Sequence, residues 1–144
     1  MKKYTIKTMK DTGNLAEKIA GQLKGGEVIG FIGNLGAGKT TFIQYLAKYI
    51  GVKQTVNSPT FNIIKVYKIK NSKIKNFTHI DAYRLNSADE LRALGVEEFV
   101  DNPKTITVIE WADKVGEILP KDAIVIKIKL NKDGSRVFEI KMPR

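Results

Sequence analysis

The chain has 144 residues and a net charge of +10, from 25 Lys and Arg against 15 Asp and Glu, with one His and no Cys. We expect one domain over 1–144 that needs no disulfide, and the lack of Cys and near-lack of His exclude thiolate sites, thiol nucleophiles and multi-His metal cages. No apolar run approaches the roughly 20 residues of a membrane span and no signal peptide is evident, so we expect a cytoplasmic protein without a membrane partner.

The spacing of apolar residues and the positions of glycines predict the helices and strands in the first half of the chain. Leu15, Ile19 and Leu23 recur every four residues after Asp11, which indicates a helix with Asp11 as its N-cap. The apolar run 27–32 lies between glycines and is typical of a buried strand. In chain order, we expect a strand at 4–7, a helix at 12–24, a strand at 27–32, a glycine-rich turn at 33–38, a helix at 39–50 that ends at Gly51, and a hairpin of strands at 61–70 and 73–80.

The second half alternates short helices with strands. The segment 87–90, Ser-Ala-Asp-Glu, has the pattern of a capping box, and Asp133-Gly134 marks a turn between the last two strands. In chain order, we expect a helix at 88–94, a helical turn at 96–100, a strand at 105–109, a short helix at 112–118, and strands at 123–130 and 136–142. This alternation predicts an α/β fold with a central mixed β-sheet flanked by helices.

The loop at 33–40 carries the pattern Gly-x-x-x-x-Gly-Lys-Thr between a predicted strand and a predicted helix. In this context the glycines let backbone N–H groups face a phosphate, and the helix N-terminus adds its dipole. Lys39 supplies charge to the β- and γ-phosphates, and Thr40 offers a hydroxyl to Mg²⁺. The pattern therefore predicts nucleotide and Mg²⁺ binding in a P-loop NTPase-like three-layer fold. The expected nucleotide contacts here are Gly33, Asn34, Leu35, Gly36, Ala37, Gly38, Lys39, Thr40 and Thr41.

Hydrolysis needs more than this loop, because the attacking water must also be oriented. Glu110 ends a predicted strand, where catalytic groups of open α/β sheets lie, so it is the first candidate for activating water. The alternative is an acid that caps the next helix. Asp81 follows another strand-like run and can reach Mg²⁺ through water; alternatively, it pairs with Arg84 in a turn.

Three further positions have two interpretations each. Within 58–60, Ser-Pro-Thr, a hydroxyl such as that of Thr60 contacts the γ-phosphate, or the segment is a simple turn. The single His79 is a positioned base beside Asp81, or a structural side chain near a strand end. Trp111 covers the nucleotide or docks a partner, or it packs in the interior.

Four segments occur in one order: Gly-Asn-Leu-Gly-Ala-Gly-Lys-Thr-Thr at 33–41, Ser-Pro-Thr-Phe at 58–61, His-Ile-Asp-Ala-Tyr-Arg-Leu at 79–85, and Glu-Trp-Ala at 110–112. The first is common to many ATPases, whereas the His-x-Asp-x-Tyr-Arg and Glu-Trp segments at this spacing are more specific. Over nearly its whole length, the chain resembles the TsaE family, the ATPase component of bacterial tRNA threonylcarbamoyladenosine biosynthesis.

The resemblance implies an ATP–Mg²⁺ site between the P-loop and the Glu-Trp strand. It also implies that the protein acts together with TsaB and TsaD, which transfer a threonylcarbamoyl group to adenosine 37 of tRNA. The ATPase is then not itself the transferase. The implied roles are catalysis by Glu110 and Lys39, Mg²⁺ binding by Thr40, Asp81 and Glu110, and nucleotide contacts by Thr60 and Trp111.

Positive charge is concentrated in the first part of the chain. Residues 1–80 contain 14 Lys and Arg and 3 acids, whereas residues 81–144 contain 11 and 12. Such a distribution favours polyanionic partners. The predicted hairpin alone carries Lys65, Lys68, Lys70, Lys73 and Lys75. These lysines indicate a solvated edge that resists aggregation, a contact with tRNA, or a surface for an acidic protein; no DNA partner is expected.

Three other functions are alternatives to this ATPase. A small-molecule kinase needs a lid that brings arginines over the phosphates, and the four arginines of this chain are dispersed. A GTPase of the Ras type needs Asn-Lys-x-Asp, whereas residues 102–105 are Asn-Pro-Lys-Thr. A nucleotide-dependent module for RNA or protein binding would use the loop only to hold a structural ligand.

Overall fold

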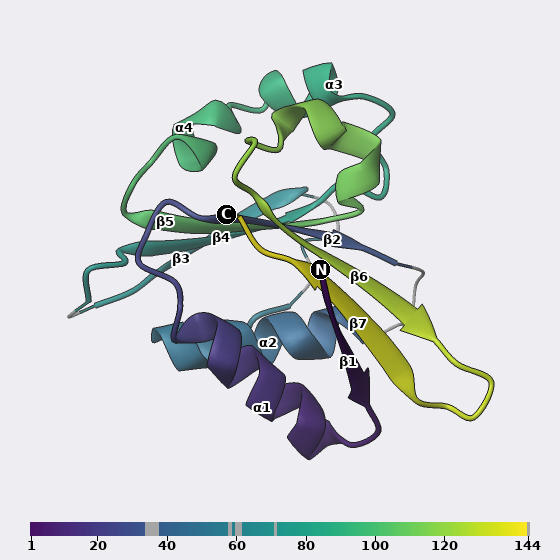
Figure 1. Cartoon of the computed structure of the whole chain (residues 1–144). Coiled ribbons are helices and arrows are strands. Elements are labelled where there is room, and N and C mark those ends of the chain that lie inside the picture. Colours follow the sequence, from purple (N-terminus) through teal and green to yellow (C-terminus); the bar gives the residue numbers. More distant parts are fainter. Residues whose placement is uncertain (34–37, 58, 60–61, 71, 144) are drawn as a thin grey trace.

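The computed structural model of the chain describes residues 1–33, 38–57, 59, 62–70 and 72–143. Within these residues, seven strands form one sheet in the order β1-β7-β6-β2-β5-β4-β3 (Figure 1). The elements are β1 (Lys2–Ile6), α1 (Met9–Ala20), β2 (Val28–Ile32), α2 (Lys39–Ile50), β3 (Ile64–Lys68), β4 (Asn76–Asp81), α3 (Ala88–Arg92), α4 (Glu97–Val100), β5 (Thr105–Glu110), the 3₁₀ helix η1 (Ala112–Ile118), β6 (Ile124–Leu130) and β7 (Arg136–Lys141).

The four strands β6, β2, β5 and β4 are parallel to one another, and antiparallel pairs close both edges of the sheet. The strands β2 and β5 are buried on both faces over nearly their whole length, as central parallel strands are. The strand β6 alternates buried and exposed residues because it lies nearer one edge. The sheet is mixed, as the sequence predicts.

Helices cover both faces of the sheet, with α1 and α2 on one side and α3, α4 and η1 on the other (Figure 1). On the first side, the ring of Phe42 lies 5.7 Å from that of Phe31 and 5.2 Å from that of Phe138. On the second side, Ile109 packs in a smaller core with Leu91 and with residues of η1. The α/β architecture with helices on both faces is confirmed.

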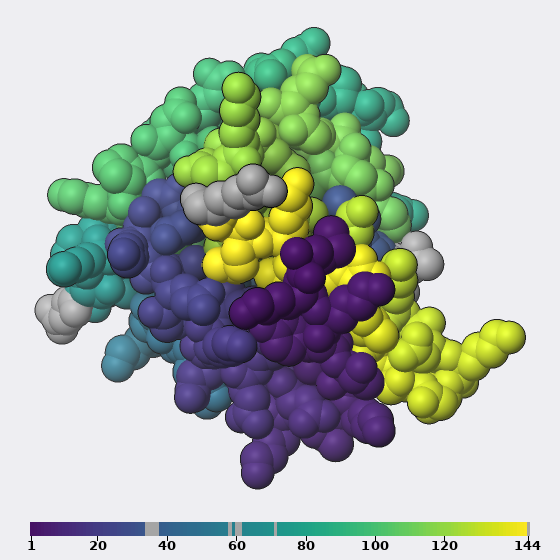
Figure 2. All heavy atoms as spheres, in the orientation of Figure 1, coloured from purple at the N-terminus to yellow at the C-terminus, as the bar shows by residue number. Residues whose placement is uncertain are grey.

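The two ends of the chain lie side by side, since β1 pairs with β7 (Figure 2). In Figure 2 the purple N-terminal residues lie directly against the yellow last strand. The described part of the chain contains no helix that is long and apolar enough to cross a membrane.

The helix α1 begins at Met9, three residues earlier than the predicted start at residue 12. Thr8 is the N-cap: its hydroxyl accepts a hydrogen bond from the N–H of Asp11, and the Asp11 carboxylate accepts one from the N–H of Thr8 at 3.1 Å. The prediction of Asp11 as N-cap is therefore wrong, because Asp11 is the third helical residue of a reciprocal capping box. The helix also ends earlier, at Ala20 with Gly21 as its C-cap.

Two other local predictions need correction. Ser87 is the N-cap of α3, but its side chain makes no capping hydrogen bond, and the Glu90 carboxylate accepts from the N–H of Asn86 instead. The strand predicted at 61–70 is confined to β3 because Ile63 has a φ of 64°, which no extended strand can include. The predicted β3–β4 hairpin is confirmed by its antiparallel register.

Candidate functional site

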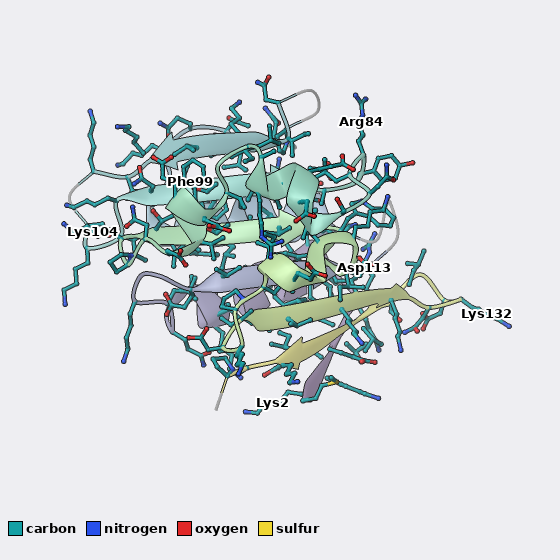
Figure 3. The ribbon with its side chains drawn as sticks, turned by 90° about the horizontal axis from the view of Figure 1, so that it is seen from above. Lys2, Arg84, Phe99, Lys104, Asp113 and Lys132 are labelled. Carbon is teal, nitrogen blue, oxygen red and sulfur yellow. The ribbon has the colours of Figure 1, made fainter. Side chains whose placement is uncertain are left out.

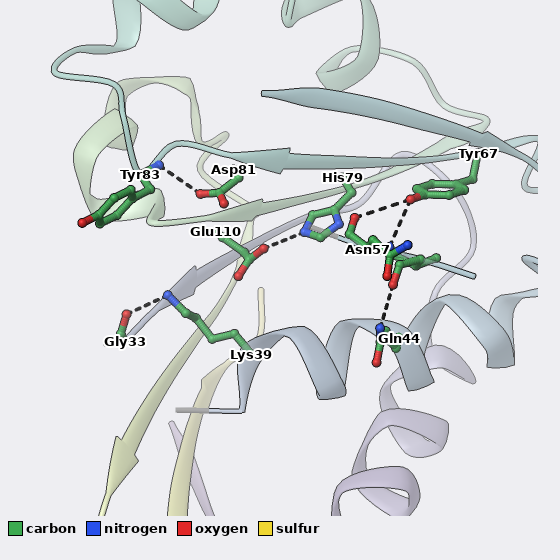
Figure 4. A network of polar contacts seen from close by, with 10 residues as sticks. Gly33, Lys39, Gln44, Asn57, Tyr67, His79, Asp81, Tyr83 and Glu110 are labelled. Atoms are coloured by element: carbon green, nitrogen blue, oxygen red, sulfur yellow. Dashed lines mark hydrogen bonds and ion pairs between the residues drawn. The ribbon is translucent and has the colours of Figure 1, made fainter. Parts of the chain in front are cut away.

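Two carboxylates end adjacent parallel strands at the same edge of the sheet. The register of β4 and β5 pairs Asp81 with Glu110, the last residue of each strand. Lys39 opens α2 shortly after the end of β2, so the three side chains converge above the carboxyl ends of the strands (Figure 4). This edge is where ligands bind in open α/β sheets.

Lys39 is a buried cation, with 4% of its surface exposed. Its Nζ donates to the carbonyl oxygen of Gly33 at 2.7 Å and lies 4.3 Å from the centroid of the Trp111 ring. Burial lowers the pKa of Lys39, and the negative charges of Glu110, Asp81 and Asp113 oppose that change. The ammonium group is thus held at the site by a carbonyl, an aromatic face and nearby carboxylates, and an anionic ligand is a stronger partner than any of these.

Glu110 is buried and hydrogen-bonded to His79, with 2.7 Å between its Oε2 and the Nε2 of the imidazole (Figure 4). An ionised carboxylate only accepts, so Nε2 of His79 carries the proton of this bond. The other ring nitrogen, Nδ1, has no partner among the described residues. His79 therefore fixes the orientation of the Glu110 carboxylate; its partner is Glu110 and not Asp81.

The carboxyl group of Asp81 accepts a hydrogen bond from the N–H of Tyr83 at 3.0 Å. Burial raises the pKa of Asp81, and the neighbouring charge of Glu110 raises it further, against the opposing effects of the Tyr83 hydrogen bond, His79 and Lys39. Two carboxylates in adjacent positions favour a cation between or beside them.

The donor set fits a hard cation such as Mg²⁺. It consists of the carboxylates of Asp81 and Glu110 and the hydroxyl of Thr40, which is half-buried in the first turn of α2. Across the described ranges, no three His, Cys, Asp or Glu side chains are grouped to hold a metal ion. These side chains would therefore hold a magnesium ion together with a phosphate ligand, and not in a cage made by protein alone.

Trp111 directly follows Glu110 and adopts a φ of 59°, a strained conformation for a bulky residue. Its ring lies 5.2 Å from that of Tyr83, and Lys114 Nζ lies 5.0 to 5.5 Å from both ring centroids while it donates to the Tyr83 carbonyl. This cluster holds the Trp111 ring against the ammonium group of Lys39.

The start of α2 has no side-chain cap, and its N-cap residue Gly38 has a φ of 92°. A Cβ atom at Gly38 would lie 3.1 Å from Nε of Arg136, so the Arg136 side chain packs against this residue. That Nε atom is buried without a hydrogen-bond partner in the described structure. Arg136 is not among the predicted site residues, because nothing in the local sequence pattern shows that β7 returns it to Gly38.

Several predicted site residues lie outside the described residues: Asn34, Leu35, Gly36, Ala37, Ser58 and Thr60. Thr41 is half-buried in the first turn of α2, and Arg84 is exposed beyond the end of β4 (Figure 3). The structure thus brings together Gly33, Lys39, Asp81, Glu110 and Trp111 from the predicted set, and it adds His79 and Arg136 to them.

The chain matches the family model of the Threonylcarbamoyl adenosine biosynthesis protein TsaE over residues 6–138. It is 34% identical to the tRNA threonylcarbamoyladenosine biosynthesis protein TsaE of Rickettsia typhi, over 96% of this chain and 93% of that protein. The identity to proteins of the same name is 37% in Bacillus subtilis, over 93% and 81%, and 39% in Aquifex aeolicus, over 97% and 96%. The fold is similar to the crystal structure of Bacillus subtilis YdiB, with a TM-score of 0.75 and 28% identity over 99% of this chain and 86% of that one.

Proposed function

Because the chain belongs to the TsaE family of threonylcarbamoyl adenosine biosynthesis proteins, we propose that it binds and hydrolyses ATP with Mg²⁺ in support of tRNA threonylcarbamoyladenosine formation. One observation carries the proposal: Lys39, Asp81 and Glu110 meet at the carboxyl ends of parallel strands, beside the start of α2. Hydrolysis of a phosphoanhydride needs three such groups. They are a cation that binds the phosphates, a carboxylate that binds the metal ion, and a carboxylate that orients the attacking water.

The first step is phosphate binding by α2 and its lysine. The uncapped N–H groups of the first turn of α2 face the incoming anion, and Lys39 exchanges the Gly33 carbonyl for a phosphate oxygen. Arg136 packs against Gly38, so its unpartnered Nε–H is available to the same ligand. Thr40 and Asp81 would hold Mg²⁺, which supplies positive charge to the phosphate oxygens when bound.

Glu110 orients the attacking water and accepts its proton. The water oxygen forms a bond to the γ-phosphorus, the bond from that phosphorus to the bridging oxygen breaks, and the electron pair leaves with ADP. The hydrogen bond from His79 Nε2 holds one carboxylate oxygen of Glu110 and so sets the orientation in which the carboxylate meets the water.

The proposed partners are TsaB and TsaD, which the family resemblance implies as the enzymes that modify adenosine 37 of tRNA. The name shared by the relatives supports this assignment, because it describes proteins of tRNA threonylcarbamoyladenosine biosynthesis. A tRNA-modifying system works where tRNA is, so we place the protein in the cytoplasm.

The substitution Glu110→Gln tests the proposed catalytic role. We expect ATP binding within about threefold of wild type and a turnover number about 10²–10³-fold lower, because the amide cannot accept the proton of water. Turnover is measured as phosphate release at saturating ATP, alone and with TsaB–TsaD, and binding is measured by calorimetry with a non-hydrolysable ATP analogue.

The matched control is Glu98→Gln, which removes an exposed acid of α4 and should leave both quantities unchanged. Wild-type turnover in Glu110→Gln would overturn the catalytic assignment. A loss of analogue binding in that variant would instead make Glu110 a ligand-binding residue. Phosphate transfer that requires an added acceptor would favour the kinase alternative.

A further inference from the structure

The stretch from residue 28 to residue 80 contains eight lysines and no Asp or Glu. Lys39 belongs to the site described above. The other seven are exposed: Lys48, Lys53, Lys65, Lys68, Lys70, Lys73 and Lys75. The nucleotide site uses none of them, so their charge needs a separate account.

The fold gathers most of these lysines at the end of the sheet opposite to the candidate site. A Cβ atom at Gly51, the C-cap of α2, would lie 3.2 Å from Ile69, just after β3. The N–H of Ile69 donates to the carbonyl of Lys75, and the N–H of Lys75 donates to the carbonyl of Lys104, each at 2.8 Å. The end of α2, the β3–β4 connection and the start of β5 therefore meet. We call this surface the basic end: Lys48, Lys53, Lys68, Lys70, Lys73, Lys75 and Lys104.

The basic end is also concave. An open hollow of about 600 Å³ lies beside the end of α2, and the side chains that line it include Gln44, Lys48, Lys53 and Thr55. Two ammonium groups and a hydroxyl offer hydrogen-bond donors there, while the Gln44 amide already donates to the carbonyl of Val56. A hollow with donors and positive charge suits phosphate groups.

Carboxylates do not neutralise this surface. None of the seven lysines of the basic end forms an ion pair with a residue that the structure describes. The nearby Glu27 carboxylate accepts hydrogen bonds from the N–H groups of Lys24 and Gly25. Acidic residues instead concentrate in the layer of α3, α4 and η1 on the other face of the sheet: Asp89, Glu90, Glu97, Glu98, Asp113 and Glu117. The charge of the molecule is therefore separated in space as well as in sequence.

Protection of the sheet edge explains only part of this pattern. Lysines on β3 do keep an edge strand from pairing with another chain, and this accounts for Lys65 and Lys68. Lys48 lies on α2, Lys53 follows that helix, and Lys104 precedes β5, so none of these three lies on an edge strand. Their common feature is their place at one end of the molecule.

We propose that the basic end binds the phosphate backbone of a structured RNA. Lysines bind phosphates as point charges, which suits a contact with the backbone that does not read individual bases. Protein interfaces need apolar anchors, yet Tyr67, Ile69 and Ile74 between the lysines are all buried. Tyr49, which is exposed beside Lys48, stacks on Tyr45 with 6.5 Å between the ring centroids, and the ring of Tyr67 is buried. One ring engaged in this way does not form a stacking platform for single-stranded bases, which leaves the backbone of a folded RNA as the ligand.

An unmodified tRNA transcript tests the proposal, by fluorescence anisotropy across a salt series without ATP. The variant Lys70→Gln/Lys73→Gln/Lys75→Gln should bind at least about tenfold more weakly than wild type at low salt. Its slope of log affinity against log salt should be smaller by about 2–3, because each phosphate contact contributes roughly 0.7–0.9. The use of tRNA as the probe rests on the proposed function, but binding does not require ATP hydrolysis.

The matched control is Lys121→Gln/Lys127→Gln/Lys132→Gln, which removes the same charge from exposed lysines in and beside β6, none of which belongs to the basic end. Figure 3 shows Lys132 and Lys104 at opposite ends of the molecule. This control should lose less than about threefold in tRNA affinity. Both triple variants should keep the melting temperature and the ATP turnover of wild type, so a failure of the RNA proposal and a failure of the ATPase proposal are distinguishable.

Equal losses in the two triple variants would show an effect of net charge alone and would overturn the proposal. Undetectable tRNA binding by wild type at low salt would do the same. A duplex DNA of equal length that competes as well as tRNA would reduce the surface to a general polyanion contact and contradict the assignment to RNA. Weakened binding to TsaB–TsaD with unchanged tRNA binding would identify a protein contact instead.

Discussion

Lys39 shows how single residues define the site. Its side chain is almost fully buried, yet it keeps only one hydrogen bond to a described residue, to Gly33, and otherwise faces an aromatic ring. Burial penalises a charged group, and the nearby carboxylates only partly compensate for it. A phosphate ligand would relieve this penalty, which is why we propose a binding role for this residue rather than a role in the stability of the unliganded fold.

His79 and Glu110 act as a unit in the proposed reaction, with His79 as a positioning residue. In His79→Ala, the Glu110 carboxylate loses its orienting donor, and we expect a turnover number about 10–100-fold lower with the KM for ATP within about threefold. His79→Gln keeps a donor near the position of Nε2 and should recover part of the turnover. Steady-state kinetics of both variants make the comparison.

A merely structural role for His79 predicts a different outcome. Both variants would then lose melting temperature and turnover together, without rescue by Gln. A large change in KM with unchanged turnover number would also contradict the positioning role.

Asp81 links pH to both stability and metal binding. Burial raises its pKa, so the folded chain holds this proton more tightly than the unfolded chain, and stability is gained as the pH falls from the raised pKa toward the ordinary value of 3.8. Mg²⁺ needs the ionised carboxylate, so Mg²⁺ affinity should fall over the same range.

The variant Asp81→Asn separates these two effects. At pH 7, without ligand, its melting temperature should rise on the order of 2 °C, because the buried charge is removed. The Mg²⁺ concentration for half-maximal turnover should rise about tenfold. Asp122→Asn, which changes an exposed acid, is the control. An unchanged Mg²⁺ titration in Asp81→Asn would remove this residue from the metal site.

At the scale of elements, the site depends on how closely η1 packs on β2. Gly30 lies in the middle of β2, where a Cβ atom would come within 2.9 Å of Cβ of Ala112 and 3.2 Å of Leu119. The absence of a side chain at Gly30 therefore lets η1 approach the sheet. Because η1 begins just after Trp111, this packing also places the aromatic ring over Lys39.

The substitution Gly30→Ala should disturb this packing. We expect a loss of about 1–3 kcal/mol in the free energy of unfolding from overpacking against η1, measured by urea denaturation. Gly116→Ala is the matched control, since Gly116 lies in η1 with no atom within 4 Å of the added Cβ, and it should change stability by less than about 0.5 kcal/mol. Equal stability of the two variants would show that η1 can shift without cost.

At the scale of the whole molecule, one end of the parallel strands carries the carboxylates and the opposite end carries the exposed lysines. The site joins β2, β4, β5 and α2, so a ligand there holds together the central sheet and one helical layer. A ligand that binds the folded chain and not the unfolded chain must raise the free energy of unfolding.

Ligand-linked stability provides the corresponding prediction. ATP analogue with Mg²⁺ at a hundred times its Kd should stabilise the fold by about 2.7 kcal/mol, which corresponds to a rise of roughly 5–10 °C in melting temperature. Removal of Mg²⁺ with a chelator should reduce this rise, and Lys39→Ala should abolish it. Calorimetry of the three samples gives the result, and a full shift in Lys39→Ala would contradict the phosphate-binding role.

The amino-acid sequence by itself determined the elements and the position of the site. The buried strand β2, the helix α2 and the acids at the ends of β4 and β5 follow from local spacing, because apolar periodicity and glycines act within a few residues. The family follows as well, from the order of four short segments. The roles given to the site residues stay predictions, and Asn34, Leu35, Gly36, Ala37 and Thr60 also lie outside the described residues.

The tertiary structure alone decided which distant residues meet. The hydrogen bond between His79 and Glu110 spans 31 positions, Arg136 returns to Gly38 on the far strand of a hairpin, and the basic end draws on α2, the β3–β4 connection and the segment before β5. These contacts depend on strand order and on parallel or antiparallel pairing. Local patterns do not determine either, because both result from how whole faces of the elements pack together.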